Sequence, residues 1–166
     1  VDLGYSPAEI GAVVKLFGFS ATLLGALLGG VWVLRVGIRT ALWHFGFAQM
    51  LSTLGFVLLT RLGHSPGGLA LVVATENLTA GMGTAAFLAF MASQTNQRYT
   101  ATQYALFSSI MGIPRTLLAA PTGWMAELLG WSGFFILCTL LAVPGFWLLK
   151  QLEGWLTTPA SQPVNV

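Results

Sequence analysis

The sequence predicts an all-α fold, a polytopic bundle of membrane-spanning helices, and two observations lead to this prediction. Hydrophobic residues make up 55% of the 166 residues and charged residues only 7%, whereas charged residues are about 25% of a soluble protein. The apolar residues lie in long continuous runs, whereas the strands of a membrane β-barrel alternate apolar and polar residues. A soluble domain could not cover its surface with so few charges, and a disordered chain needs low hydrophobicity and high charge.

Five segments are long and apolar enough to cross a bilayer, which takes about 20 residues in a helix. We expect these spans at about 8–33, 40–61, 68–94, 104–127 and 132–149. Short polar breaks separate them, and Ser6-Pro7-Ala8-Glu9 is a capping box that starts the first helix. Residues 1–150 therefore form the predicted transmembrane bundle. Residues 151–166, with several Thr, Pro and Ser, are expected to be a disordered cytoplasmic tail.

The loop charges predict the orientation of the chain in the membrane. With five spans, one side carries Arg61 and the other carries Arg35, Arg39, Arg98 and Lys150. Because Lys and Arg are enriched in cytoplasmic loops, we expect an external N-terminus and a cytoplasmic C-terminus. The first residues lack the pattern of a signal peptide, and the chain begins in an expected external loop. We therefore expect it to be a C-terminal fragment of a larger membrane protein.

Three ionisable residues inside the predicted spans are the main candidates for a functional site: Lys15, Glu76 and Arg115. Charges inside a membrane span are costly, so they usually face a polar interior and mark a pathway. At a helical period of 3.6 residues, Asn77 lies beside Glu76, and Tyr104 shares a face with Arg115. One Lys, one Arg and one Glu along a path favour an anionic or zwitterionic solute.

We expect Lys15 and Arg115 to bind solute and Glu76 to couple transport to protons. A structural role is the alternative for each of them. Glu76 could pair with Lys15 or Arg115 to hold helices together, Arg115 could extend toward the membrane interface, and Lys15 could serve structure or gating. The predicted spans 40–61 and 132–149 carry no Asp, Glu, Lys or Arg between their ends, so we expect both to face lipid.

Glycines supply a separate prediction about helix packing. Gly25 and Gly29 form a GxxxG pair, a motif that lets a second helix approach closely. Gly81 and Gly83 are expected to play the same role on the third predicted span.

Several other classes of function find no support in the sequence. There is no GxSxG, HExxH or P-loop motif, so we expect no enzyme. Two isolated histidines and the single cysteine, Cys138, form neither a metal site nor an internal disulfide, and no cofactor is implied. The formal net charge is +2 without a basic stripe, which argues against nucleic-acid binding.

The loop after the first predicted span reads Gly30-Val-Trp-Val-Leu34-Arg35-Val-Gly37-Ile-Arg39. It resembles the cytoplasmic G-x-x-x-D-R-x-G-x-R/K signature of major facilitator transporters, with Leu34 at the acidic position. Gly30, Arg35, Gly37 and Arg39 carry the resemblance. It implies that the chain is a partial C-terminal half of such a carrier, with spans eight to twelve of twelve.

Longer stretches resemble the AmpG muropeptide permease family. These are residues 6–11 with Lys15, residues 76–87, and residues 100–108, which include Gln103 and Tyr104. The resemblance covers residues 3 to about 150. It implies a bacterial inner-membrane permease that imports anhydromuropeptides (GlcNAc-anhydroMurNAc peptides) for peptidoglycan recycling by proton symport and that affects β-lactamase induction. We add Asn77, Gln103 and Tyr104 to the expected substrate-binding residues.

The implied partners are an anionic sugar–peptide solute, protons, the lipid bilayer and the N-terminal half of the carrier, which this chain lacks. Because the sites of such carriers lie between two halves, the chain would supply one wall of a cavity and would not transport alone. Two alternatives stay open. A related carrier could move another anionic solute, such as acetyl-CoA, or a drug, and a truncated helix bundle could pack with membrane partners without transporting anything.

Overall fold

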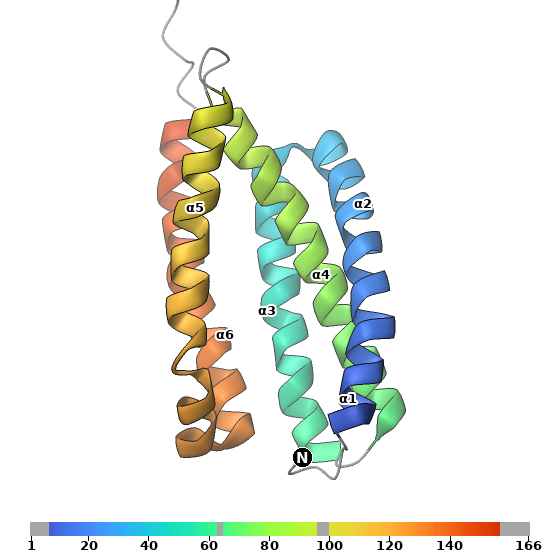
Figure 1. The fold of residues 1–166 in the computed structure, drawn as a ribbon. Helices are drawn as coiled ribbons and strands as arrows, with labels where there is room; N and C mark the ends of the chain where they lie inside the picture. The colour runs from blue at the N-terminus through green and yellow to red at the C-terminus, as the bar shows by residue number, and fades with distance from the viewer. Residues whose placement is uncertain (1–6, 63–64, 96–99, 157–166) are drawn as a thin grey trace, which may run out of the picture.

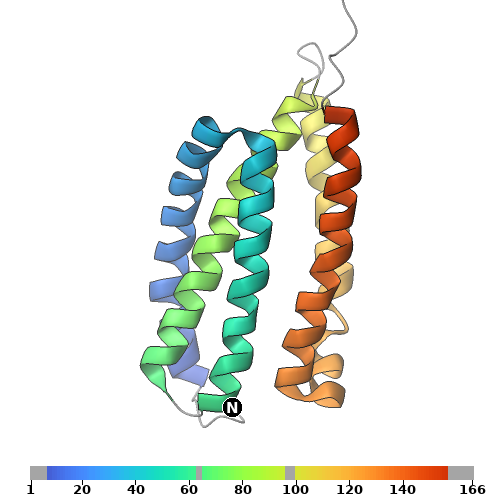
Figure 2. The same ribbon diagram turned by 180° about the vertical axis from the view of Figure 1, so that it is seen from behind.

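The computed structural model describes residues 7–62, 65–95 and 100–156, and at some positions, among them Glu9 and Arg115, it describes the backbone alone. All regular structure in these ranges is helical (Figures 1 and 2). The helices are α1 (Pro7–Val13), the π-helical segment η1 (Val14–Gly18), α2 (Phe19–Val36), α3 (Ile38–Leu62), α4 (Pro66–Ser93), α5 (Thr100–Ala119) and α6 (Thr122–Leu156). Of the expected capping box, Ser6 lies outside the described residues.

Four helical segments in the described part of the chain are long and apolar enough to cross a membrane. They cover Ile10–Val36, Ile38–Arg61, Pro66–Ser93 and Thr122–Gln151. Many of their large apolar side chains lie on the outer surface: Leu34 is 87% exposed and Phe19 is 71% exposed. An apolar exterior of this extent suits a lipid environment, because soluble proteins expose much smaller apolar patches. The predicted all-α membrane fold is confirmed.

The fourth predicted span, 104–127, differs from the structure. Helix α5 ends at Ala119, a turn follows at Ala120 and Pro121, and α6 begins at Thr122. The backbone N–H of Met125 donates to the carbonyl of Pro121, so a new helix starts at this proline. The apolar run continues through the turn, which is why hydropathy alone placed the end of the span too late.

The break expected between the predicted spans 104–127 and 132–149 lies inside α6, at Gly130. This glycine has φ 68° and ψ 163°, and the helix is kinked there. Beyond the kink, α6 continues through Leu156, past the boundary expected at residue 150. The rest of the expected disordered tail, 157–166, lies outside the described residues.

The described helices pack mainly along α3 and α4. Helix α2 packs along α4, and α3 packs against α4 on one side and α6 on the other. Figures 1 and 2 show α2, α3 and α4 together, with α5 and α6 beside them. A buried cluster near the α2–α3 link consists of Val33, Ala41, Phe45 and Ala86. A second one at the other end of α3 consists of Leu59, Leu69 and Val73.

A single residue, Gly37, joins α2 to α3. It has φ 83° and ψ 157°, a conformation that is essentially restricted to glycine, and its N–H donates to the Val33 carbonyl at 2.9 Å. We predict that Gly37→Ala destabilises the folded chain by about 1–3 kcal/mol, the usual cost of such backbone strain. The midpoint of unfolding by dodecyl sulfate, followed by circular dichroism in mixed micelles, measures this effect.

Gly30→Ala is the matched control for Gly37→Ala. Gly30 lies inside helix α2, and a Cβ there would meet no described heavy atom within 4 Å. Alanine is the better helix former, so this variant is expected to be as stable as the original chain or slightly more stable. Equal unfolding midpoints for the two variants would contradict the strain argument.

Candidate functional site

Glu76 lies on α4 and points toward α3, where it is half-buried among polar side chains. Gln49 donates from Nε2 to Glu76 Oε1, and Ser52 Oγ donates to Oε2 at 2.5 Å. Thr53 Oγ1 lies 3.4 Å from both carboxylate oxygens, and Thr79 Oγ1 lies 3.1 Å from Ser52 Oγ. We call these five residues the Glu76 cluster.

The spacing of these residues along two helices explains why they meet. Gln49, Ser52 and Thr53 stand at positions i, i+3 and i+4 of α3, so they share one face. Glu76 and Thr79 are three residues apart on α4 and share a face too. The packing of α3 against α4 therefore buries one polar stripe against another within two otherwise apolar helices.

The partners of Glu76 among the described side chains are all uncharged. Within the described part of the chain, Glu76 forms no ion pair, and Lys15 is exposed in η1 without an ion pair to it. An ion pair between Glu76 and Lys15, one of the structural alternatives, is therefore not present. The side chain of Arg115 lies outside the description, so pairing of Glu76 with Arg115 stays a hypothesis.

Neutral amide and hydroxyl partners suit a carboxyl group that changes its protonation state. Hydroxyl groups can donate to a carboxylate and can also accept from a carboxylic acid, and an amide carries both a donor and an acceptor. A fixed cation beside Glu76 would instead favour the ionised form alone. The surroundings of Glu76 can thus satisfy the group with its proton and without it.

The expectation that the predicted span 40–61 faces lipid is wrong for one side of this helix. Three residues of α3 contact the Glu76 carboxylate, and α3 also forms one wall of a pocket with α6. Polar uncharged residues at helical spacing form these contacts. They are not conspicuous when only Asp, Glu, Lys and Arg are considered as candidates. Gln49, Ser52, Thr53 and Thr79 are the site residues that the sequence analysis missed.

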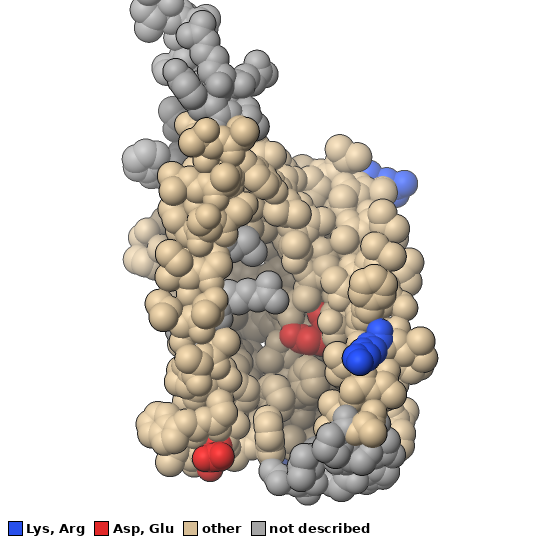
Figure 3. Space-filling model, in the orientation of Figure 1, with Lys and Arg blue, Asp and Glu red and all other residues tan. Residues whose placement is uncertain are grey.

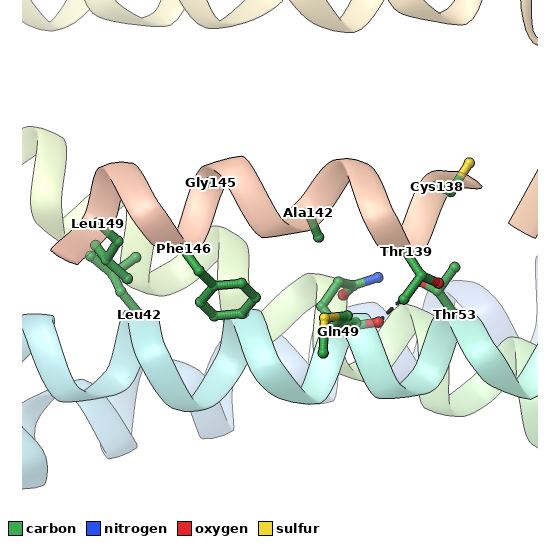
Figure 4. A pocket seen from close by; sticks show the side chains of 11 residues that line it. Leu42, Gln49, Thr53, Cys138, Thr139, Ala142, Gly145, Phe146 and Leu149 are labelled. Atoms are coloured by element: carbon green, nitrogen blue, oxygen red, sulfur yellow. Dashed lines mark hydrogen bonds between the residues drawn. The ribbon is translucent and has the colours of Figure 1, made fainter. Parts of the chain in front are cut away.

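A pocket of about 360 Å³ lies between α3 and α6. Its polar side chains are Gln49, Thr53 and Thr139, and Figure 4 shows Gln49 and Thr53 on α3 facing Thr139 on α6. The remaining lining is mostly apolar and includes Leu42 and Phe146. A second pocket of about 360 Å³ lies between α3 and α4, and Gln49 lines it as well. Gln49 therefore connects the Glu76 cluster to both pockets.

The surface beside the cluster is hollowed. Figure 3 shows acidic surface inside a hollow between α5 and the group of α2, α3 and α4, with basic surface on the same face of the molecule. Lys15 lies in the π-helical segment η1, a type of irregularity that is frequent at functional sites. Gln103 and Tyr104 are half-buried on α5, the helix across the hollow from α2, α3 and α4 (Figure 3).

Asn77, the neighbour of Glu76 in sequence, points toward a different helix. Its Oδ1 accepts from Thr22 Oγ1 of α2 at 3.2 Å, and its Nδ2 donates to the Val73 carbonyl at 2.8 Å. A Cβ built on Gly18 would lie 3.2 Å from the Asn77 amide nitrogen. The structure therefore places Asn77 in the contact between α2 and α4 and Glu76 in the contact between α3 and α4. A substrate-binding role for Asn77 stays a prediction.

Glycines make the contact between α2 and α4 unusually close. A Cβ on Gly25 would overlap the backbone of Leu78, and one on Gly29 would lie 2.7 Å from the Met82 Cα. From the other side, a Cβ on Gly81 would overlap the Thr22 carbonyl. The expectation is wrong for Gly83, because a Cβ there meets no described heavy atom within 4 Å. Gly83 instead lines the pocket between α3 and α4.

The signature residues stand at the junction of α2 and α3. Gly30 and Arg35 belong to the C-terminal part of α2, Gly37 is the link, and Arg39 lies in the first turn of α3. The positive φ of Gly37 gives a physical reason for the glycine that the signature has at this position.

Helices of membrane length that enclose a hydrogen-bonded carboxylate define a multi-pass membrane protein. The chain belongs to the Major Facilitator Superfamily, whose family model matches residues 1–165. The superfamily predicted from the loop signature is confirmed.

Relatives of known name point to one branch of this superfamily. The chain is 37% identical over 147 residues to the anhydromuropeptide permease of Escherichia coli K12, covering 89% of this chain and 30% of that protein. It is 35% identical over 153 residues to a Rickettsia conorii protein that carries the name AmpG 4, covering 92% and 37%. An uncharacterized Haemophilus influenzae protein is 40% identical over 163 residues, covering 90% and 38%. The chain thus spans about a third of the length of these relatives, and the resemblance to the AmpG family is confirmed.

Proposed function

We propose that the chain is part of a proton-coupled secondary transporter that imports anhydromuropeptides across the bacterial inner membrane for cell-wall recycling. The name of the Escherichia coli relative supports the solute class. The observation that carries the proposal is the Glu76 cluster, a half-buried carboxylate held by neutral hydrogen-bonding partners within helices of membrane length. An effect on β-lactamase induction would follow from the imported muropeptide.

Glu76 is the proposed proton-coupling group. As a carboxylate it accepts hydrogen bonds from Gln49 and Ser52 of α3. When it binds a proton, it loses its charge and gains an O–H donor beside its remaining acceptor capacity, so one of these partners can accept a hydrogen bond from it instead. Hydrogen bonds to a charged group are about twice as strong as neutral ones, so protonation weakens the contact between α3 and α4. Proton binding is in this way linked to helix packing.

The proposed solute contacts come from other helices. Lys15 in η1 and Arg115 in α5 supply positive charge for the acidic groups of a muramyl peptide, and Gln103 and Tyr104 in α5 supply polar contacts. Arg35, Arg39 and Lys150 would lie on the cytoplasmic side, with the N-terminus external. Because the chain spans about a third of its relatives, the remaining wall of the path would come from sequence outside it.

A chimeric carrier tests this proposal. The matching segment of the Escherichia coli permease is replaced by this chain, and uptake of labelled anhydromuropeptide is measured in right-side-out membrane vesicles with an imposed proton gradient. We predict concentrative uptake by the chimera, loss of that uptake on addition of a protonophore, and no uptake by the chain alone. The unaltered permease and vesicles without carrier set the upper and lower limits.

Two results would contradict different parts of the proposal. A chimera that reaches the membrane in normal amount but takes up no muropeptide would contradict the assigned solute. Uptake that persists in the presence of the protonophore would contradict proton coupling.

A further inference from the structure

The side-chain amide of Gln49 has an unusual hydrogen-bond pattern. Its Nε2 donates to Glu76 Oε1, while its own Oε1 is buried and has no hydrogen-bond partner within the described part of the chain. A buried carbonyl oxygen without a partner is destabilising, and such groups are rare in folded proteins. The pattern therefore suggests a second state in which this oxygen is used.

Gln49 differs from Ser52 and Thr53, the two hydroxyl residues beside it, in the hydrogens that it can donate to hydrogen bonds. Thr53 has one hydroxyl hydrogen, and its Oγ1 lies 3.0 Å from the Gln49 main-chain carbonyl, closer than the 3.4 Å to the Glu76 oxygens. Ser52 also has one hydrogen, and the Gln49 carbonyl at 2.9 Å and Glu76 at 2.5 Å are both acceptors for it. Gln49 alone among these three combines an amide donor on Glu76 with an unused acceptor.

We propose that Gln49 is a positioning residue that hydrogen-bonds Glu76 in both of its protonation states. Ionised Glu76 accepts from Nε2, as in the structure. When Glu76 carries a proton, the amide rotates by half a turn about its terminal bond, and Oε1 accepts the hydrogen of the carboxyl group. That bond is a broad, roughly two-fold torsion, so the rotation needs no change in the helix. The importance of this step for transport rests on the proposed function.

Other titratable groups lie on the elements packed around the cluster. Among the described side chains they are His44 of α3, Lys15 of η1, Tyr104 of α5, and Cys138, Glu127 and Lys150 of α6, and Cys138 lines the α3–α6 pocket together with Gln49. The structure shows no ion pair or hydrogen bond from any of these six to Glu76. An experiment must still separate their titration from that of Glu76.

Infrared titration of the chain in lipid bilayers makes this separation. The carbonyl stretch of a protonated carboxyl group is distinct from the bands of the His, Lys, Tyr and Cys groups, and the component that is lost in Glu76→Gln and kept in Glu127→Gln belongs to Glu76. We expect Gln49→Met, which keeps the length of the side chain but removes the amide, to move the titration of this band by roughly one pH unit toward higher pH. Gln49→Met removes a bond from both states of Glu76, and the bond to the ionised state is about twice as strong, so the difference between the two sets the shift.

Gln94→Leu is the matched control, because it removes an exposed glutamine amide at the C-terminal end of α4. Its Glu76 band is expected to titrate as in the original chain. A Gln49→Met titration that coincides with this control would overturn the proposal.

A second measurement needs no variant of Gln49. In the original chain with isotope-labelled glutamine, a side-chain amide band should shift as Glu76 takes up its proton, and this shift should vanish in Glu76→Gln. A titrating Glu76 band without any glutamine shift would overturn the inference and leave proton coupling standing. Absence of a titrating Glu76 band would overturn the proton-coupling proposal itself, whereas failure of chimeric uptake would leave the titration results unchanged.

Discussion

Glu76→Gln should abolish the pH dependence of uptake by the chimeric carrier without unfolding it. Glutamine has the shape of glutamate; its carbonyl oxygen can accept from Gln49 while its NH2 group donates to the Ser52 hydroxyl, so the α3–α4 contact is retained. The amide cannot bind a proton at physiological pH. If one proton moves with each solute, each unit of pH gradient contributes about tenfold solute accumulation. The Glu76→Gln carrier should lose this contribution. Gradient-driven uptake measures this loss, and solute exchange without a gradient shows whether binding survives.

Glu127→Gln is the control for this experiment. Glu127 is an exposed carboxylate on α6, near the kink at Gly130, and none of the Glu76 cluster contacts it. The same chemical change there should leave uptake dependent on the gradient. If the Glu76→Gln carrier still accumulated solute in proportion to the gradient, Glu76 would not be the coupling group.

Gly81→Ala should cause a large loss of stability, as should Gly25→Ala on the facing helix. The Cβ added at Gly81 would overlap the Thr22 carbonyl, a backbone atom that cannot rotate away, so α2 and α4 would have to separate. Overpacking of this kind costs about 1–3 kcal/mol and occasionally more. The separation would also lengthen the Thr22–Asn77 hydrogen bond, which is 3.2 Å long. Unfolding by dodecyl sulfate, followed by circular dichroism, measures the effect.

Gly83→Ala tests whether the close contact is the cause. It makes the same change on the same helix, where a Cβ meets no described heavy atom within 4 Å. We expect no loss of stability and a small gain from helix propensity. Gly25→Ala and Gly81→Ala disturb the same helix contact. The double variant should therefore lose less stability than the two single variants added together. Similar losses for Gly81→Ala and Gly83→Ala would refute the argument.

The helices could largely be predicted from the sequence because lipid imposes a simple rule. Every backbone polar group in the membrane core must be satisfied, so a long apolar run forms a helix. The breaks at Gly37 and Gly130 were also predictable, since glycine adopts the positive φ that both require. The end of α5 was not, because Ala120 and Pro121 interrupt the helix without interrupting the apolar run.

The candidate site was predictable at its charged residue and unpredictable at its neutral ones. Glu76 is conspicuous in an apolar helix because an intramembrane charge is costly. Gln49, Ser52 and Thr53 are not, because single amide and hydroxyl groups occur in many membrane helices. Their i, i+3, i+4 spacing was visible in the sequence, but the side of α3 that faces α4 depends on packing. The same dependence separates Gly81, which contacts α2, from Gly83, which does not.

The one-residue link at Gly37 has a mechanical consequence for the whole chain. Neighbouring Cα atoms are about 3.8 Å apart, so α2 and α3 cannot slide past each other along the membrane normal without unwinding a turn of helix. The interlocked backbones at Gly25 and Gly81 tie α2 to α4, and the hydrogen bonds of Glu76 tie α4 to α3. These three helices therefore form a closed frame. Helix α6 contacts this frame along α3, and α5 contacts it at α4.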